Sequence, residues 1–165
     1  MSVRSAVREH EYTSHIEWTG NLGEGTLTYK GYDRSWTMST PGKPVLACSN
    51  DPMLGGDAMK YNPEDILLSA LSACHMLWYL HLAAVAGIVV RSYSDDPLGI
   101  GETLAGGQGR FLRAELRPTI TVDPGTDFVR ADAIHGEVHD FCFIARSVNF
   151  PISCRATYLT SEAQS

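Results

Sequence analysis

Clusters of lysine and arginine are missing from this sequence of 165 residues, in which 19 acidic residues outnumber 13 basic ones and give a formal net charge of −6. Proteins that bind nucleic acids or anionic membranes through charge carry a basic patch, so we expect neither partner. The first residues, MSVRSAVREHEY, also lack the apolar run of a secretory signal. With only four cysteines and no such signal, reduced thiols are favoured over a disulfide framework, and we expect a cytoplasmic protein.

The one long apolar stretch runs without a formal charge from Ile66 to Val90, which is long enough to cross a membrane. Two serines and two histidines interrupt it, and Gly87 separates it from the β-branched residues 88–90, which favour a strand. A helix that is apolar nearly all round also suits the centre of a soluble domain. We therefore expect a core helix here rather than a membrane span.

Length and composition fit one globular domain over residues 1–165, with 44% apolar residues available to form its core. The pattern of apolar residues and caps predicts five segments in order: a meander of about three strands over 12–40, a central helix over 63–86, strands over 88–122, a second helix over 127–146 and a final strand over 152–159. Antiparallel strands with segregated helices are typical of an α+β fold.

Two cysteines lie on the presumed inner faces of the two expected helices. Cys74 is in the middle of the central helix, and Cys142 is late in the second one. A free cysteine in a helix often packs as a small hydrophobic residue. Two thiols that meet can also carry out thiol–disulfide chemistry, in which one sulfur attacks the substrate and the other resolves the oxidised sulfur as a disulfide. Cys48 and Cys154 are expected to be structural.

These residues resemble a known family. Asn-Pro-Glu-Asp at positions 62–65, a helix rich in leucine, alanine and serine, Cys74 ten residues after Glu64, and a second cysteine late in another helix resemble the OsmC/Ohr family. The resemblance implies an α+β fold in which antiparallel sheets wrap around long central helices in an intertwined homodimer. It also implies a thiol-dependent peroxidase that reduces organic hydroperoxides at the dimer interface.

The resemblance further implies the roles of individual residues. Cys74 corresponds to the peroxidatic nucleophile, Cys142 to the resolving thiol, and Glu64 to the acidic site residue. No bound cofactor is implied, because an external dithiol of the lipoyl type supplies the electrons. Helix geometry adds that ten residues rise about 15 Å, so Glu64 can reach a site at Cys74 only from a second subunit.

The family also has an activating arginine early in the sheet region, and here this sequence differs. The corresponding strand reads Ser-Trp-Thr-Met-Ser over residues 35–39, and the nearest cation is Arg34. Arg146, one helical turn beyond Cys142, is another source of positive charge. Without a positive partner the thiols are structural, and the alternative function is a non-catalytic dimer that binds a small apolar ligand at its interface.

A third possibility is a metal-binding dimer. His135, His139 and Cys142 stand at positions i, i+4 and i+7, which share one face of the expected second helix and can supply three ligands. His75 and His81 are further candidates from the central helix. Histidines in such positions more often line an interface or hydrogen-bond within it, so we expect no metal site.

Overall fold

A computed structural model describes residues 8–162 of the chain. It divides into two compact units, Met1–Glu64 and Asp65–Ser165. Each unit is described by itself.

The first unit contains a small antiparallel sheet of three strands in the order β1-β2-β3. These are β1 (His15–Trp18), β2 (Trp36–Ser39) and β3 (Leu46–Cys48), and a short 3₁₀ turn, η1 (Pro52–Leu54), follows them. The predicted meander over 12–40 is wrong in its middle, because residues 20–35 form turns and bends. Gly23 and Gly25, with φ values of 121° and 58°, lie where the sequence predicts a turn, but the alternation at Leu27 and Tyr29 gives bends and a turn instead of a strand.

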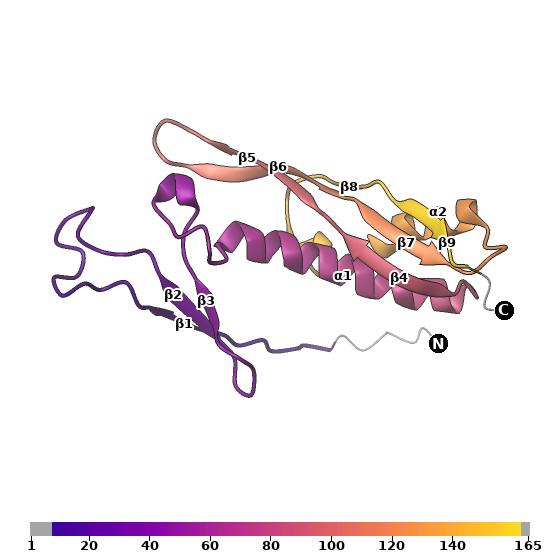
Figure 1. The fold of residues 1–165 in the computed structure, drawn as a ribbon, viewed down its shortest axis with the longest axis horizontal. Coiled ribbons are helices and arrows are strands. Elements are labelled where there is room, and N and C mark those ends of the chain that lie inside the picture. Colours follow the sequence, from indigo (N-terminus) through magenta and orange to yellow (C-terminus); the bar gives the residue numbers. More distant parts are fainter. Residues whose placement is uncertain (1–7, 163–165) are drawn as a thin grey trace, which may run out of the picture. The chain divides into compact units, whose positions relative to one another are not determined.

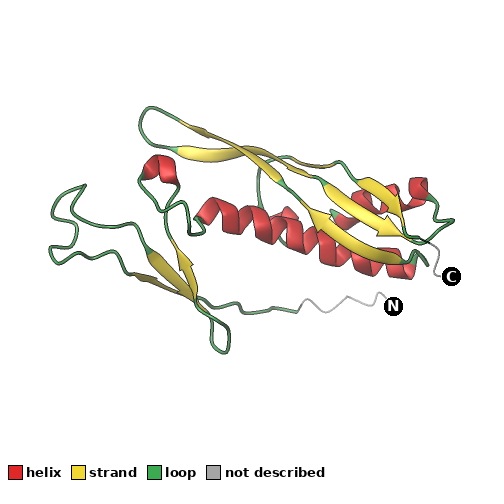
Figure 2. Ribbon diagram, viewed as in Figure 1, coloured by secondary structure: helices red, strands yellow, loops and turns green. Residues whose placement is uncertain are grey.

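The second unit combines two helices with six strands (Figures 1 and 2). Its elements are α1 (Pro63–Val85), which begins at the boundary between the units, β4 (Val90–Asp95), β5 (Leu98–Thr103), β6 (Gly109–Leu116), β7 (Pro118–Val122), α2 (Phe128–Val138), the 3₁₀ turn η2 (Ala145–Ser147), β8 (Ile152–Cys154) and β9 (Thr157–Thr160). The strands form two sheets in the orders β4-β7-β9 and β5-β6-β8. The architecture is therefore mixed α+β, as predicted.

The expectation of purely antiparallel sheets is wrong. β4 pairs with β7 and β5 with β6 in antiparallel fashion, but β8 runs parallel to β6, and β9 runs parallel to β7. A parallel neighbour requires a crossover, which α2 and the segment after it supply. The predicted final strand over 152–159 is divided because β8 and β9 pair with different strands.

The central helix α1 agrees with its prediction within one residue. Pro63 occupies the first helical position, where its missing N–H costs nothing. At the other end Gly87 has φ 73°, and the Ile88 amide donates to the Ala83 carbonyl at 2.9 Å, which closes the helix as a glycine cap does.

The second helix α2 is much shorter than predicted. It begins at a cap formed by Asp127, whose carboxylate accepts from the amides of Val129 and Arg130, and it ends at Val138. The Phe141 amide then bonds the Val138 carbonyl three residues back, so the chain tightens into turns instead of continuing the helix. The prediction of a helix to residue 146 is therefore wrong, and Cys142 lies in a turn.

The core of the second unit lies between the helices and the sheets. Its buried members come from α1, β6, β7, α2 and the turns after α2: Leu71, Tyr79, Ala83, Ala114, Leu116, Ile120, Val122, Ile134, Val138, Cys142 and Ala145. By length and composition α1 is also able to cross a membrane, but a single such helix is weak evidence, because core helices of soluble proteins pass the same test. The inner face of α1 contributes to this core.

Candidate active site

Two of the four predicted site residues meet in the second unit. Cys74 is half-buried in the middle of α1, and Cys142 is buried in the turn after α2; both are free thiols. Cys74 lies close enough to raise the pKa of the Cys142 thiol, although the two residues are 68 positions apart in the sequence. The Cys142 Sγ atom accepts from the Ala145 amide at 3.4 Å. The packing of α1 and the chain after α2 on one core therefore brings the two thiols near one another.

The surroundings of Cys142 keep its proton in place. Burial raises the pKa of this thiol to about 11, and the nearby Cys74 acts in the same direction because it favours the protonated form. Backbone amides of Ala145 and Ile144 oppose the shift but do not cancel it. At neutral pH Cys142 consequently carries its proton.

Aromatic side chains surround the pair. Trp78 follows Cys74 by one helical turn, Phe141 precedes Cys142, and their rings stack with centroids 5.0 Å apart and planes at 29°. Next to them is a pocket of about 290 Å³, which is lined by Phe141, Phe143, Arg146 and Ser147. The pocket thus combines apolar walls with one guanidinium group.

The other two predicted site residues, Arg34 and Glu64, belong to the first unit. Arg34 donates to the carbonyls of Tyr29 and Tyr32 at 3.0 Å and lies 4.7 Å from the centroids of both rings. Glu64 is exposed in the first turn of α1. Because α1 is continuous, Glu64 and Cys74 of one chain are about 15 Å apart along its axis.

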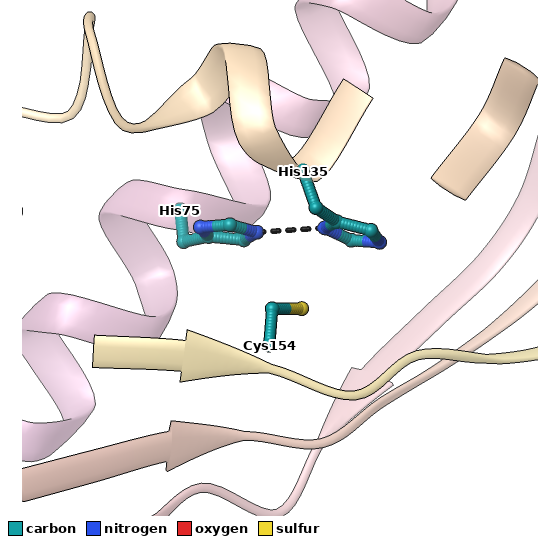
Figure 3. Close-up of side chains that lie close together, drawn as sticks. All are labelled: His75, His135 and Cys154. Carbon is teal, nitrogen blue, oxygen red and sulfur yellow. Dashed lines mark hydrogen bonds between the residues drawn. The ribbon is translucent and has the colours of Figure 1, made fainter. Parts of the chain in front are cut away.

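A second cluster, which we call the His–His–Cys cluster, consists of His75, His135 and Cys154 (Figure 3). α1, α2 and β8 contribute one residue each. The His75 Nε2 and His135 Nδ1 atoms are 2.8 Å apart, and the two rings are nearly parallel, at 10°. The side chain of Cys154 points from β8 toward both rings. Potential ligand atoms of the three residues lie within 4.8 Å of one another.

Burial determines the protonation states of this cluster. It lowers the pKa of His75 and of His135 to about 4, so both imidazoles are neutral at neutral pH. Burial also raises the pKa of Cys154 to about 12, and the negative charges of Asp95, Asp132 and Glu115 raise it further. The cluster accordingly holds two neutral rings and a protonated thiol.

The metal set considered from sequence spacing is different from the set that the fold assembles. His139 is the C-terminal cap of α2, and Cys142 lies beyond the end of the helix, so the three residues do not share the face of one helix. Among the described residues, the His–His–Cys cluster is the group whose ligand atoms lie close enough to hold a metal ion. Cys154 was expected to be structural, and no spacing rule links three residues on three separate elements.

Comparisons with known proteins place these features in a family. A family profile described as OsmC-like protein matches residues 55–156, more than half of the chain and a range that includes both cysteines of the pair. The chain belongs to the OsmC-like protein family. The resemblance noted from the sequence is therefore confirmed.

Solved OsmC-like structures agree with this assignment. An OsmC-like protein of unknown function from Vibrio cholerae is 26% identical, with a TM-score of 0.81 over 90% of this chain and 100% of that one. An OsmC-like protein from Mycoplasma pneumoniae is 15% identical, with a TM-score of 0.70 over 92% and 99%. An organic hydroperoxide resistance protein from Elizabethkingia anophelis is 18% identical, with a TM-score of 0.65 over 93% and 100%. No curated protein matches the chain.

Proposed function

We propose that this OsmC-like protein is a thiol-dependent peroxidase that reduces organic hydroperoxides, with Cys74 as the attacking thiol and Cys142 as the resolving thiol. The observation that carries the proposal is that the two thiols, which come from distant parts of the chain, pack at the same core and that Cys74 raises the pKa of Cys142. An organic hydroperoxide resistance protein is among the structures with this fold, which supports the same reaction class.

The proposed reaction balances as follows. The Cys74 thiolate attacks the distal oxygen of the hydroperoxide, the O–O bond breaks, and the alkoxide takes a proton and leaves as an alcohol. Cys74 is then a sulfenic acid, which Cys142 attacks to form a disulfide and release water. An external dithiol of the lipoyl type reduces this disulfide by thiol–disulfide exchange and is itself oxidised. Reduced thiols of this kind are maintained in the cytoplasm, where we expect the protein to act.

The pocket beside Cys142 supports an organic substrate. Phe141 and Phe143 line it and offer apolar surface to the organic group of the hydroperoxide. The Arg146 amide donates to the Cys142 carbonyl at 3.1 Å, and we assign its guanidinium the positive charge that the developing alkoxide needs. We therefore propose Arg146, rather than Arg34, as the positive partner of the reaction. Arg34 already donates to two carbonyl groups of its own unit.

The outer face of α1 supports a homodimer. Leu67, Leu77 and Val85 on this helix are exposed in the single chain. A second copy that covers this face buries their apolar surface, at about 25 cal/mol for each Å² removed from water. In such a dimer the Glu64 carboxylate of one subunit can also reach the thiol pair of the other subunit.

One observation favours a second candidate, a non-catalytic dimer that binds a small apolar ligand. The hydrogen bonds of Arg34 hold the arginine nearest to the family's expected position within its own unit. In this alternative the two thiols are structural, and the pocket beside Phe141 binds a ligand without chemistry.

A peroxidase assay distinguishes the two candidates. The purified protein is supplied with a dithiol and with cumene hydroperoxide, tert-butyl hydroperoxide or hydrogen peroxide, and alcohol formation is measured. We expect turnover that favours the organic substrates, loss of it in Cys74→Ser, and a single turnover in Cys142→Ser. Cys48→Ser is the matched control, because Cys48 lies in the first unit. A Cys74–Cys142 disulfide found by mass spectrometry supports the mechanism; equal turnover in wild type and Cys74→Ser would falsify it.

A further inference from the structure

The His–His–Cys cluster lies at a pocket separate from the one beside Phe141. This second pocket has a volume of about 340 Å³, and its lining includes all three residues of the cluster as well as Asp132 and His139. We propose that His75, His135 and Cys154 bind a zinc ion through one nitrogen of each ring and the thiolate, with the fourth coordination position open to this pocket. This site goes beyond the proposed peroxidase, which uses neither histidine nor Cys154.

The donor set fits zinc. Zinc takes imidazole nitrogen and thiolate sulfur in tetrahedral sites, with Zn–N bonds of about 2.0–2.1 Å and Zn–S bonds of about 2.3 Å. Ligand atoms on such an ion lie about 3.3–3.6 Å apart. Zinc binding therefore requires the two ring nitrogens, 2.8 Å apart, to separate by about 0.5 Å, the rings to turn so that both nitrogens face the ion, and the sulfur to move closer.

One polar atom of the cluster has no hydrogen-bond partner among the described residues. His75 Nε2 and His135 Nδ1 share one proton in either tautomeric arrangement. In both arrangements the buried Nε2 atom of His135 has no hydrogen-bond partner among the described residues. Buried ring nitrogens are nearly always paired. This atom is the ring nitrogen that does not face His75, so zinc on Nδ1 leaves it unmet, and it does not by itself identify the ion.

The electrostatic surroundings favour a cation. Asp95, Asp132 and Glu115 all act on Cys154 with negative charge, and Asp95 acts on His75 as well. Arg155 lies 3.9 Å from Glu115 and offsets part of that charge, whereas Asp132 lines the pocket directly. A dication in the cluster lowers the electrostatic cost of ionising the thiol, because a coordinating thiol loses its proton to solvent. Binding therefore releases one proton for each ion.

A metal site also needs a path by which the ion can enter, and the pocket provides it. It reaches the cluster between α2 and β8, the elements to which most of its lining residues belong. Three protein ligands with one open position are typical of catalytic zinc sites, whereas structural sites use four. The open position therefore has room for a water molecule or for a small anionic ligand.

Cobalt substitution tests the zinc site without a peroxidase measurement. A failure of the zinc proposal is therefore distinguishable from a failure of the peroxidase proposal. Tag-free protein is treated with EDTA and titrated with Co²⁺. We expect one equivalent to bind with tetrahedral d–d bands and a thiolate-to-cobalt charge-transfer band, and we expect Zn²⁺ to displace it. Cys154→Ser should lose the charge-transfer band, and His135→Gln should lose stoichiometric binding. Cys48→Ser and His81→Gln, a thiol and a histidine outside the cluster, should keep both.

A further variant and a measurement on the unmodified chain complete the test. Cys142→Ser should retain the charge-transfer band, which excludes a set built on His135, His139 and Cys142. X-ray absorption of the zinc-loaded wild-type protein should find one sulfur among nitrogen and oxygen ligands, whatever the stability of the variants. Absence of stoichiometric binding, a zinc shell without sulfur, or a band that survives Cys154→Ser overturns the proposal.

Discussion

Cys74, in the middle of α1, raises the pKa of the Cys142 thiol in the segment after α2, so the two side chains act on one another. Both elements pack on the same core, which contains Cys142 itself and has Cys74 at its edge. The relative position of the two sulfurs is consequently determined by core packing rather than by a mobile loop.

The reactivity of Cys142 should depend strongly on pH. Burial, together with the nearby Cys74, raises the pKa of Cys142 to about 11, so its alkylation rate should rise about tenfold per pH unit from neutrality toward that value. Cys74→Ala removes the neighbour that helps to retain the proton, so the profile should move to lower pH. Peptide-resolved mass spectrometry after timed iodoacetamide treatment measures this. Full reactivity of Cys142 at pH 7, or no shift in Cys74→Ala, contradicts the assignment.

The two candidate arginines should behave differently in the peroxidase assay. Arg146→Gln should lower kcat/KM for cumene hydroperoxide by about 100-fold, because it removes the positive charge from the pocket beside Cys142. Arg146→Lys should recover part of the activity. Arg34→Gln serves as the comparison and should affect mainly the stability of the first unit, where Arg34 bonds two carbonyls. If Arg34→Gln lowers kcat/KM more than Arg146→Gln does, Arg34 is the positive partner of the reaction.

The stacked rings of Trp78 and Phe141 should be coupled energetically. A stacked aromatic pair contributes about 0.5–1.5 kcal/mol beyond the area that it buries. In a double-mutant cycle of Trp78→Ala and Phe141→Ala, measured by urea unfolding, we expect a coupling energy in that range. The more exposed Phe143 is the control, and its pairing with Trp78 should give a value near zero. Strict additivity of Trp78→Ala and Phe141→Ala argues against the stacking.

The outer face of α1 should be the subunit interface. Sedimentation is expected to give a dimer for the wild type and a monomer for Leu77→Glu, which puts a charge on that face. Leu77 is 63% exposed in the single chain. Val129→Glu on α2, where the side chain is 81% exposed, is the matched control and should remain dimeric. A monomeric wild type, or a Leu77→Glu variant that stays dimeric, rejects this interface.

The core of the second unit should depend on Leu116. This residue is fully buried on β6, so Leu116→Ala should lower the free energy of unfolding by about 2–5 kcal/mol through lost burial and a residual cavity. Leu112 lies on the same strand at the surface, and Leu112→Ala should cost much less. Urea unfolding of both variants gives the comparison. Similar losses of unfolding free energy in the two variants would mean that Leu112 is buried as deeply as Leu116.

Much of the fold was predictable because its signals are local. Asn62 and Pro63 mark the start of α1 and Gly87 its end, and each depends on backbone conformation within a few residues. The extent of α2 was not predictable in this way. The apolar residues after Val138 continue a helical period, but tertiary packing places them outside the helix, where Cys142 and Ala145 are buried without it.

The amino-acid sequence by itself determined the α+β class, the central helix with Cys74 in its middle, and membership of the OsmC-like family, because these follow from periodicity, caps and a short motif. The family resemblance also implied that Cys74 and Cys142 act as a pair. Tertiary structure alone decided the other meeting, in which His75, His135 and Cys154 gather from three elements. Contacts of this kind depend on how whole elements pack around a shared core, and one-dimensional spacing carries no record of that packing.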